Sequence, residues 1–275
     1  MTSRLDQRFA SLKRDGRSAL VAYVMASDPD TETCFEILKG LPAAGADIIE
    51  LGFPFSDPMA DGPSIQKAAL RALKAGGSLK QTLDLARRFR ATNADTPLIL
   101  MGYANPIESM GYDAFAKAMH VAGADGAIIV DLPPEEDTPL RAAFEAHGLS
   151  IIRLATPTTD SSRLTKVVEG ASGFLYYVSV AGVTGANQAA SDSIRAAVER
   201  LKRATSLPIA VGFGVREPET ARAIAKTADA VVVGSAFVDE IAAGPKAQAV
   251  ERVLRKVAQL SEAVRSARAL EGTPA

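Results

Sequence analysis

The sequence predicts an α/β fold, a (β/α)8 TIM barrel with an extra N-terminal helix. Short apolar runs, each followed by a turn or loop, alternate with longer stretches whose apolar residues recur at helical spacing. The runs are apolar on both faces, as are parallel strands that helices cover. Eight such units fit the barrel, because a doubly wound open sheet usually has fewer strands. The predicted strands are residues 20–25, 47–51, 98–101, 127–130, 151–154, 174–178, 209–211 and 230–233.

Helices are predicted before, between and after these strands. About residues 1–16 form an amphipathic helix packed on the barrel, because Leu5, Phe9 and Leu12 share one helical face. Residues 245–268 predict a final helix on the outside, and about residues 269–275 are expected to fray. No linker-like stretch divides the chain, so residues 1–275 are expected to form a single barrel domain.

A short sequence motif repeats before three of the predicted strands. Ala-Gly-Ala-Asp ends at Asp47 and again at Asp125, and Lys-Thr-Ala-Asp ends at Asp229. In the first two copies, Gly45 and Gly123 stand where a helix ends in a left-handed cap. The motif therefore indicates where a helix ends and the next strand of the sheet begins.

Composition excludes several classes of protein. The 31 basic and 32 acidic side chains give a net charge of −1, so no nucleic-acid partner is expected. The single cysteine, Cys34, cannot form an internal disulfide, which is typical of a reducing compartment and predicts a cytoplasmic location. No apolar stretch approaches the roughly twenty residues of a membrane helix, so no membrane association is expected.

Three successive strand ends are rich in glycine and predict a phosphate site. They are residues 181–185, 212–214 and 234–235. Glycine lets the backbone approach an anion closely, and a helix N-terminus offers unpaired N–H groups. Any one cluster is more readily explained as a tight turn. Three at the loops where barrels commonly bind phosphate favour a phosphorylated small-molecule substrate.

Two acids at the second strand predict acid–base chemistry. Glu50 shares a strand face with Ile48, which directs its carboxyl into the barrel, where burial raises a carboxyl pKa. The alternative is a structural ion pair, for which only Arg153 lies in a strand. Asp61 follows in a loop of residues 52–66, which is too rich in Pro, Gly and Asp to be a helix. Asp61 could also serve only as a turn former.

Other catalytic classes lack their residues. His120 and His147 fall on predicted helices, and no cluster has metal-ligand spacing, so no metal is expected. No strand ends in lysine, so a Schiff-base mechanism has no nucleophile. Acid–base chemistry on a phosphorylated substrate remains.

Residues 50–63, Glu-Leu-Gly-Phe-Pro-Phe-Ser-Asp-Pro-Met-Ala-Asp-Gly-Pro, closely resemble the signature of the tryptophan synthase alpha chain family. The three glycine-rich segments match the phosphate loops of that family in order, and the resemblance extends from about residue 8 to residue 240. It implies a retro-aldol cleavage of indole-3-glycerol phosphate to indole and glyceraldehyde 3-phosphate.

The resemblance also implies residue roles. Glu50 moves protons between the glycerol hydroxyl and indole C3, while Asp61 accepts the indole N–H and stabilises the positive charge on the ring. Thr184, in a mobile loop, is expected to contact Asp61 and close the site. The predicted indole pocket contains Tyr23, Met101, Ile128, Tyr176 and Phe213, of which Ile128 is as readily plain barrel core; the predicted phosphate ligands are Gly185, Gly214, Gly234 and Ser235.

A partner is implied as well. Family members dock on a beta chain that carries pyridoxal phosphate and receives the indole, so an alpha2beta2 heterotetramer is expected and no cofactor is expected in this chain. Asp57, Asn105 and Pro106 are predicted to face the beta chain. Departures from the family pattern are Met25, Ser27 and Val180, which affect loop closure and communication with the partner rather than the two carboxylates.

Three alternatives stay open at this point. A phosphosugar isomerase on the same barrel would favour acids at the ends of the first and fifth strands, where Met25 and Leu154 stand. A catalytically silent subunit would not need Glu50 and Asp61. A free-standing indole-3-glycerol phosphate lyase has the same residue requirements as the family enzyme.

Overall fold

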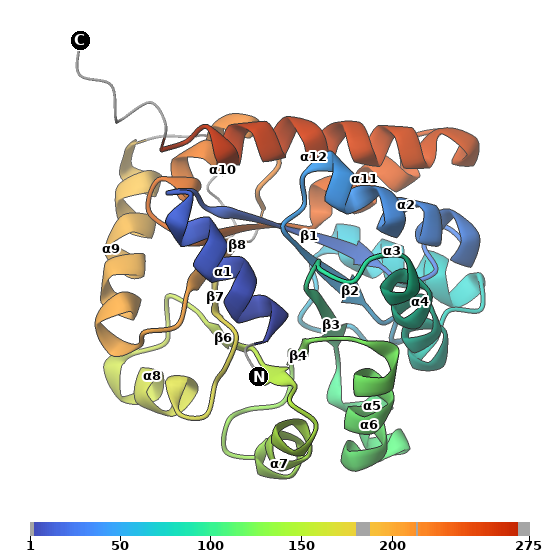
Figure 1. Cartoon of the computed structure of the whole chain (residues 1–275), viewed down its shortest axis with the longest axis horizontal. Coiled ribbons are helices and arrows are strands. Elements are labelled where there is room, and N and C mark those ends of the chain that lie inside the picture. The colour runs from blue at the N-terminus through green and yellow to red at the C-terminus, as the bar shows by residue number, and fades with distance from the viewer. Residues whose placement is uncertain (1–2, 180–187, 213, 269–275) are drawn as a thin grey trace.

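Helices and parallel strands alternate along the chain and form a barrel (Figure 1). The computed structural model describes residues 3–179, 188–212 and 214–268. The strands are β1 Ala19–Met25, β2 Ile48–Gly52, β3 Leu98–Gly102, β4 Gly126–Ile129, β5 Ser150–Ile151, β6 Arg153–Ala155, β7 Leu175–Val178, β8 Ile209–Gly212 and β9 Ala230–Val233. The helices are α1 Arg4–Arg14, α2 Thr31–Ala44, α3 Pro63–Lys74, α4 Leu79–Thr92, α5 Ala104–Met110, α6 Tyr112–Ala122, α7 Thr138–Ala146, α8 Ser161–Val168, α9 Gln188–Ala204, α10 Pro218–Ala225, α11 Ser235–Ala242, the 3-10 helix η1 Lys246–Gln248, and α12 Ala249–Arg265.

The predicted fifth strand is divided into β5 and β6. The sheet order is β5-β4-β3-β2-β1-β9-β8-β7-β6, and all its pairs are parallel. β5 pairs with β4, whereas β6 pairs with β7 on the other side. The amide of Ile152, between the two pieces, donates to the carbonyl of Ala127 at 3.0 Å. The two pieces together therefore close the sheet, and the predicted (β/α)8 barrel is confirmed.

Helix α1 covers the N-terminal mouth of the barrel. Its side chains Leu5, Phe9 and Leu12 are buried in one cluster with strand residues such as Ile48 and Ile128. Figure 1 shows α1 lying across the strands, inside the ring of outer helices. The predicted final helix corresponds to η1 and α12, and α12 packs against α2, α10 and α11. Residues 269–275 lie outside the described residues.

The three repeated aspartates each bind an amide at the start of the neighbouring strand, on its first or second residue. Asp47 accepts from the Leu20 amide at 3.0 Å, Asp125 from Leu98 at 2.8 Å and Asp229 from Ile209 at 2.9 Å. Each aspartate also forms at least one ion pair. Arg17 pairs with Asp47, Arg4 and Arg90 pair with Asp125, and Lys202 pairs with Asp229. Amides at the start of a strand need a partner when buried. The repeat therefore supplies a polar end to the sheet at its N-terminal face.

Helix α3 begins within the segment that the sequence predicts as loop. The prediction of a non-helical segment through residue 66 is wrong for its last residues, because α3 starts at Pro63. Proline is well suited to the first helical position, where its missing N–H has no intrahelical partner. The helical connection predicted between the third and fourth strands consists of two helices, α5 (Ala104–Met110) and α6. Helices α3 and α5 both follow strand ends on the C-terminal face of the barrel, where they position the candidate site.

None of the described helices is long and apolar enough to cross a membrane.

Candidate active site

Glu50 lies inside the barrel, as its strand face predicts. It is the third residue of β2 and stands in register between Tyr23 of β1 and Ile99 of β3. The side chain is 1% exposed, and its Oε1 atom has no hydrogen-bond partner among the described residues. Burial raises the pKa of Glu50 to about 8. A carboxyl in this environment is protonated at neutral pH and able to donate its proton.

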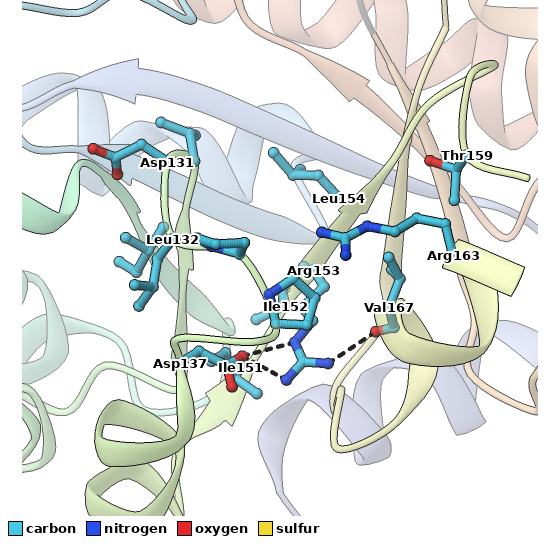
Figure 2. A pocket seen from close by; sticks show the side chains of 14 residues that line it. Asp131, Leu132, Asp137, Ile151, Ile152, Arg153, Leu154, Thr159, Arg163 and Val167 are labelled. Carbon is cyan, nitrogen blue, oxygen red and sulfur yellow. Dashed lines mark hydrogen bonds and ion pairs between the residues drawn. The ribbon is translucent and has the colours of Figure 1, made fainter.

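The alternative of an ion pair between Glu50 and Arg153 is wrong. Arg153 follows Ile152, which faces the interior, and its guanidinium points to the outside of the barrel. There its Nε donates to Asp137 at 2.9 Å and its Nη1 to the carbonyl of Lys166 at 2.9 Å. Figure 2 shows this guanidinium between Asp137 and Val167 of α8, and Arg153 is one of the residues that line a cavity of about 370 Å³. Arg153 therefore stabilises the seam of the barrel, and no cation of the described residues pairs with Glu50.

Asp61 is half-buried on the loop that leaves the same strand. Burial raises its pKa to about 6, and a hydrogen bond from the Tyr103 hydroxyl opposes that increase. The same hydroxyl accepts the Ala60 amide at 3.0 Å, which holds the loop next to the strand ends. At neutral pH the Asp61 carboxyl is mostly ionised. The two acids of the site thus differ in charge state because Glu50 is more deeply buried than Asp61 and because the hydrogen bond from Tyr103 favours the ionised form of Asp61.

Two buried tyrosines lie within electrostatic reach of both acids. Burial raises the pKa of Tyr23, and the charges of Asp61 and Glu50 raise it further. The pKa of Tyr176 is raised by burial, then by Glu50 and Asp61. Tyr23 stands in register with Glu50 on the neighbouring strand, and it lines the same small pocket as Asp61. The two predicted acids therefore lie at the same end of the barrel, and both lie near Tyr23.

Strand-end glycines make room for these rings. A Cβ atom at Gly52 would lie 2.2 Å from the Tyr23 hydroxyl oxygen, and one at Gly212 would lie 2.7 Å from the Tyr176 hydroxyl oxygen. Real Cβ atoms essentially never come that close to another heavy atom. A side chain at either position would therefore displace a tyrosine from the site.

The apolar pocket is narrow. Tyr23, Met101 and Tyr103 line it together with Asp61, and the free space between them is only about 10 Å³. An indole ring is far larger, so these side chains must move apart to admit it. Ile128 does not line this pocket; it is fully buried in the interior cluster closer to α1. Phe213 and Thr184 lie outside the described residues.

The candidate phosphate site lies at the ends of β8 and β9. Gly214 has a φ of +80°, a conformation that favours glycine, and Gly234 directly precedes the first turn of α11, where Ser235 stands. No side chain caps this helix among the residues described, so its first amides are available to an anion. Gly185 and Val180 fall outside the described residues.

The predicted interface residues lie on the same end of the barrel. Asp57 and Asn105 are exposed and Pro106 is half-buried. Met59 is 84% exposed, which is unusual for a large apolar side chain. The sequence did not indicate the hydrogen bond between Tyr103 and Asp61, because no local pattern links residues 42 positions apart. Within the described ranges, no group of three or more His, Cys, Asp or Glu residues is placed to hold a metal ion.

Comparisons with known proteins agree on one family. A family model described as tryptophan synthase alpha chain matches residues 9–268. The tryptophan synthase alpha chain of Caulobacter vibrioides is 59% identical over 267 residues, which cover 96% of this chain and 97% of that protein. The corresponding protein of Phenylobacterium zucineum is 60% identical over 268 residues, covering 97% of each.

Solved structures give the same result. The tryptophan synthase subunit alpha from Legionella pneumophila has a TM-score of 0.90 at 39% identity, covering 96% of this chain and 99% of that one. A structure of Mycobacterium tuberculosis tryptophan synthase has a TM-score of 0.87 at 37% identity, covering 96% and 99%.

Proposed function

Because this chain belongs to the tryptophan synthase alpha chain family, we propose that Glu50 and Asp61 are the groups that carry out its reaction. The reaction is the cleavage of indole-3-glycerol phosphate to indole and glyceraldehyde 3-phosphate, which makes the chain a carbon–carbon lyase of tryptophan biosynthesis. The observation that supports the residue assignment is the buried carboxyl of Glu50, whose Oε1 has no hydrogen-bond partner among the described residues, within electrostatic reach of the same two tyrosines as Asp61.

The charge states of the two acids fit the order of proton transfers. Glu50, with a pKa of about 8, donates its proton to indole C3, and the ring nitrogen becomes positively charged. Asp61, with a pKa of about 6, is ionised and accepts the indole N–H, which stabilises that charge. The Glu50 carboxylate then takes the proton of the glycerol hydroxyl. The bond from C3 to the side chain breaks, its electron pair returns to the indole ring, and the former alcohol leaves as an aldehyde.

The other predicted site residues would hold the two ends of the substrate. Tyr23, Met101 and Tyr176 would contact the indole ring, as would Phe213. The phosphate would bind the amides near the residues Gly185, Gly214, Gly234 and Ser235, and Thr184 would close the site over Asp61. A phosphosugar isomerase is less well supported, because β1 ends at Met25 and Leu154 stands in β6, where that chemistry would favour acids.

The family implies a beta-chain partner. We place the contact on Asp57, Asn105, Pro106 and the exposed Met59, in an alpha2beta2 heterotetramer. An apolar side chain that is exposed on the free chain can be buried on binding. Pyridoxal phosphate would then belong to the beta chain, because indole is consumed there.

Indole release by the purified chain, measured with and without a purified beta chain of the family, tests this function. We expect slow cleavage of indole-3-glycerol phosphate by the chain alone and a faster rate in the complex. An equal rate in both would support a free-standing lyase. No indole release in either mixture would contradict the proposed function.

A tyrosine substitution tests the charge state of Asp61. In Tyr103→Phe the hydrogen bond that favours the ionised carboxylate is lost, so the pKa of Asp61 rises above its present value of about 6. If Asp61 must be ionised, the acid limb of kcat/KM against pH moves to higher pH. Measurement from pH 5 to 9 gives that limb, and Tyr112→Phe, which loses an exposed bond to Glu108, is the matched control. An acid limb that stays in place or moves to lower pH contradicts the role of Tyr103.

A further inference from the structure

The segment that holds Asp61 is joined to the phosphate end of the barrel by a cluster of three polar side chains. Ser64 is the second residue of α3 and lies three positions after Asp61. Its hydroxyl donates to Asp239 of α11 at 3.1 Å. The guanidinium of Arg216, on the loop after β8, bonds the same Asp239 oxygen at 2.6 Å and the Ser64 hydroxyl at 3.3 Å. Two helices and one loop of the C-terminal face therefore meet at one cluster.

The three residues belong to the parts that would bind opposite ends of the substrate. Arg216 lies two positions after Gly214, and Asp239 lies one helical turn after Ser235 on the same face of α11. Ser64 belongs to the helix that begins directly after the Asp61 loop. The cluster thus connects both described phosphate segments with the acid that would bind the indole nitrogen.

The other end of α3 is fixed to the same helix. Arg71 forms two 2.7 Å bonds to the fully buried Asp28 and a third, at 3.3 Å, to the carbonyl of Val238 in α11. Between the two ends, Ala68 and Ala72 pack in one apolar cluster with Val238. Polar contacts at both ends with apolar packing between them let α3 and α11 behave as one rigid unit.

We propose that Arg216, Asp239 and Ser64 are positioning residues for the reaction, which hold Asp61 in a fixed place relative to the bound phosphate. This inference depends on the proposed function, because it assigns Asp61 and the phosphate to one substrate. None of the three side chains needs to touch the substrate. Their contribution is the geometry of Asp61, and errors of about 1 Å in such geometry can reduce rates by about a hundredfold.

Half-exposed ion pairs contribute little to stability, so the cluster can be removed without unfolding the chain. The side chains of Arg216 and Asp239 are 48% and 45% exposed. In Arg216→Ala and in Asp239→Ala we expect kcat for indole-3-glycerol phosphate to fall about tenfold. The double variant should fall no further than either single one, because both substitutions remove the same contact. Arg255→Ala, which breaks a 2.6 Å exposed pair with Glu251 on α12, is the matched control and should keep its rate.

A second measurement separates positioning from direct phosphate binding. Glycerol 3-phosphate serves as a probe of the phosphate site, with its Kd measured by calorimetry and amide exchange followed over residues 53–66. We expect its Kd to stay within about twofold in Arg216→Ala, while the protection that it gives to residues 53–66 in the wild type is lost. A rise of Kd with an unchanged kcat at saturation would make Arg216 a phosphate ligand and overturn the proposal.

Two further outcomes also decide the question. If both variants keep the wild-type kcat, or if the double variant shows the product of the two single losses, the cluster does not position Asp61. If the wild type itself releases no indole, the proposed function fails. In that case the exchange experiment still tests whether the phosphate end is coupled to residues 53–66.

Discussion

Replacing Glu50 by Gln is expected to lower kcat for indole-3-glycerol phosphate cleavage by at least about a hundredfold, the typical contribution of a positioned acid–base group. The amide keeps the size and neutral charge of a carboxyl that burial holds protonated, with a pKa of about 8. It cannot give up a proton to indole C3 or accept one from the glycerol hydroxyl. Steady-state indole release at saturating substrate measures the loss.

The fold and the phosphate site should be intact in this variant. Glutamine leaves no cavity at a position that is 1% exposed, so the circular dichroism spectrum and the Kd of glycerol 3-phosphate are expected to match the wild type. Glu32→Gln, which alters an exposed carboxylate paired with Arg88, is the control for a general effect of losing an acid. Turnover retained in Glu50→Gln would remove Glu50 from the reaction.

Asp61→Asn should be nearly as damaging, for a different reason. The carboxylate is the negative charge that we expect to face the ring nitrogen as C3 is protonated, and an amide removes that charge while keeping an oxygen acceptor. Loss of one electrostatic group of this kind typically costs about 10² to 10³ in kcat. The measurement is kcat between pH 7 and 8, where Asp61, with a pKa of about 6, is ionised in the wild type.

A turn-forming role predicts another result for the same variant. Asparagine forms such turns as well as aspartate does, so Asp61→Asn would then have only a mild effect on kcat. Asp113→Asn, at an aspartate whose side chain is 86% exposed on α6, controls for the change in net charge. A loss of less than about fivefold in Asp61→Asn would mean that the residue acts only in the turn.

The features predicted correctly from the sequence have a local signal. Alternation along β2 places Glu50 on the face of Ile48, and that face is interior wherever helices cover the outside of a sheet. The positions of the strands follow from the apolar runs, because strands of a sheet that helices cover are apolar on both faces. The packing of the N-terminal helix on the barrel was predictable because Leu5 and Phe9 share one helical face.

The features that were missed depend on contacts between distant residues. The break at Ile152 arises because one half of the fifth strand pairs with β4 and the other half with β7. The bond from Tyr103 to Asp61 joins two loops, and no spacing along the chain indicates it. The ion pair of Arg153 with Asp137 likewise depends on how the start of α7 lies beside β6, so whether Arg153 pairs with Glu50 could be settled only in three dimensions.

The aspartates at the start of the sheet have a consequence for engineering. Asp47, Asp125 and Asp229, with their cations and α1, close the barrel at the end remote from Glu50. Loops on the opposite rim can therefore be exchanged or lengthened without disturbing the groups that anchor the strands. In a library that randomises the loops of the C-terminal rim for new phosphorylated substrates, every member would keep the contacts of these three aspartates with the strands.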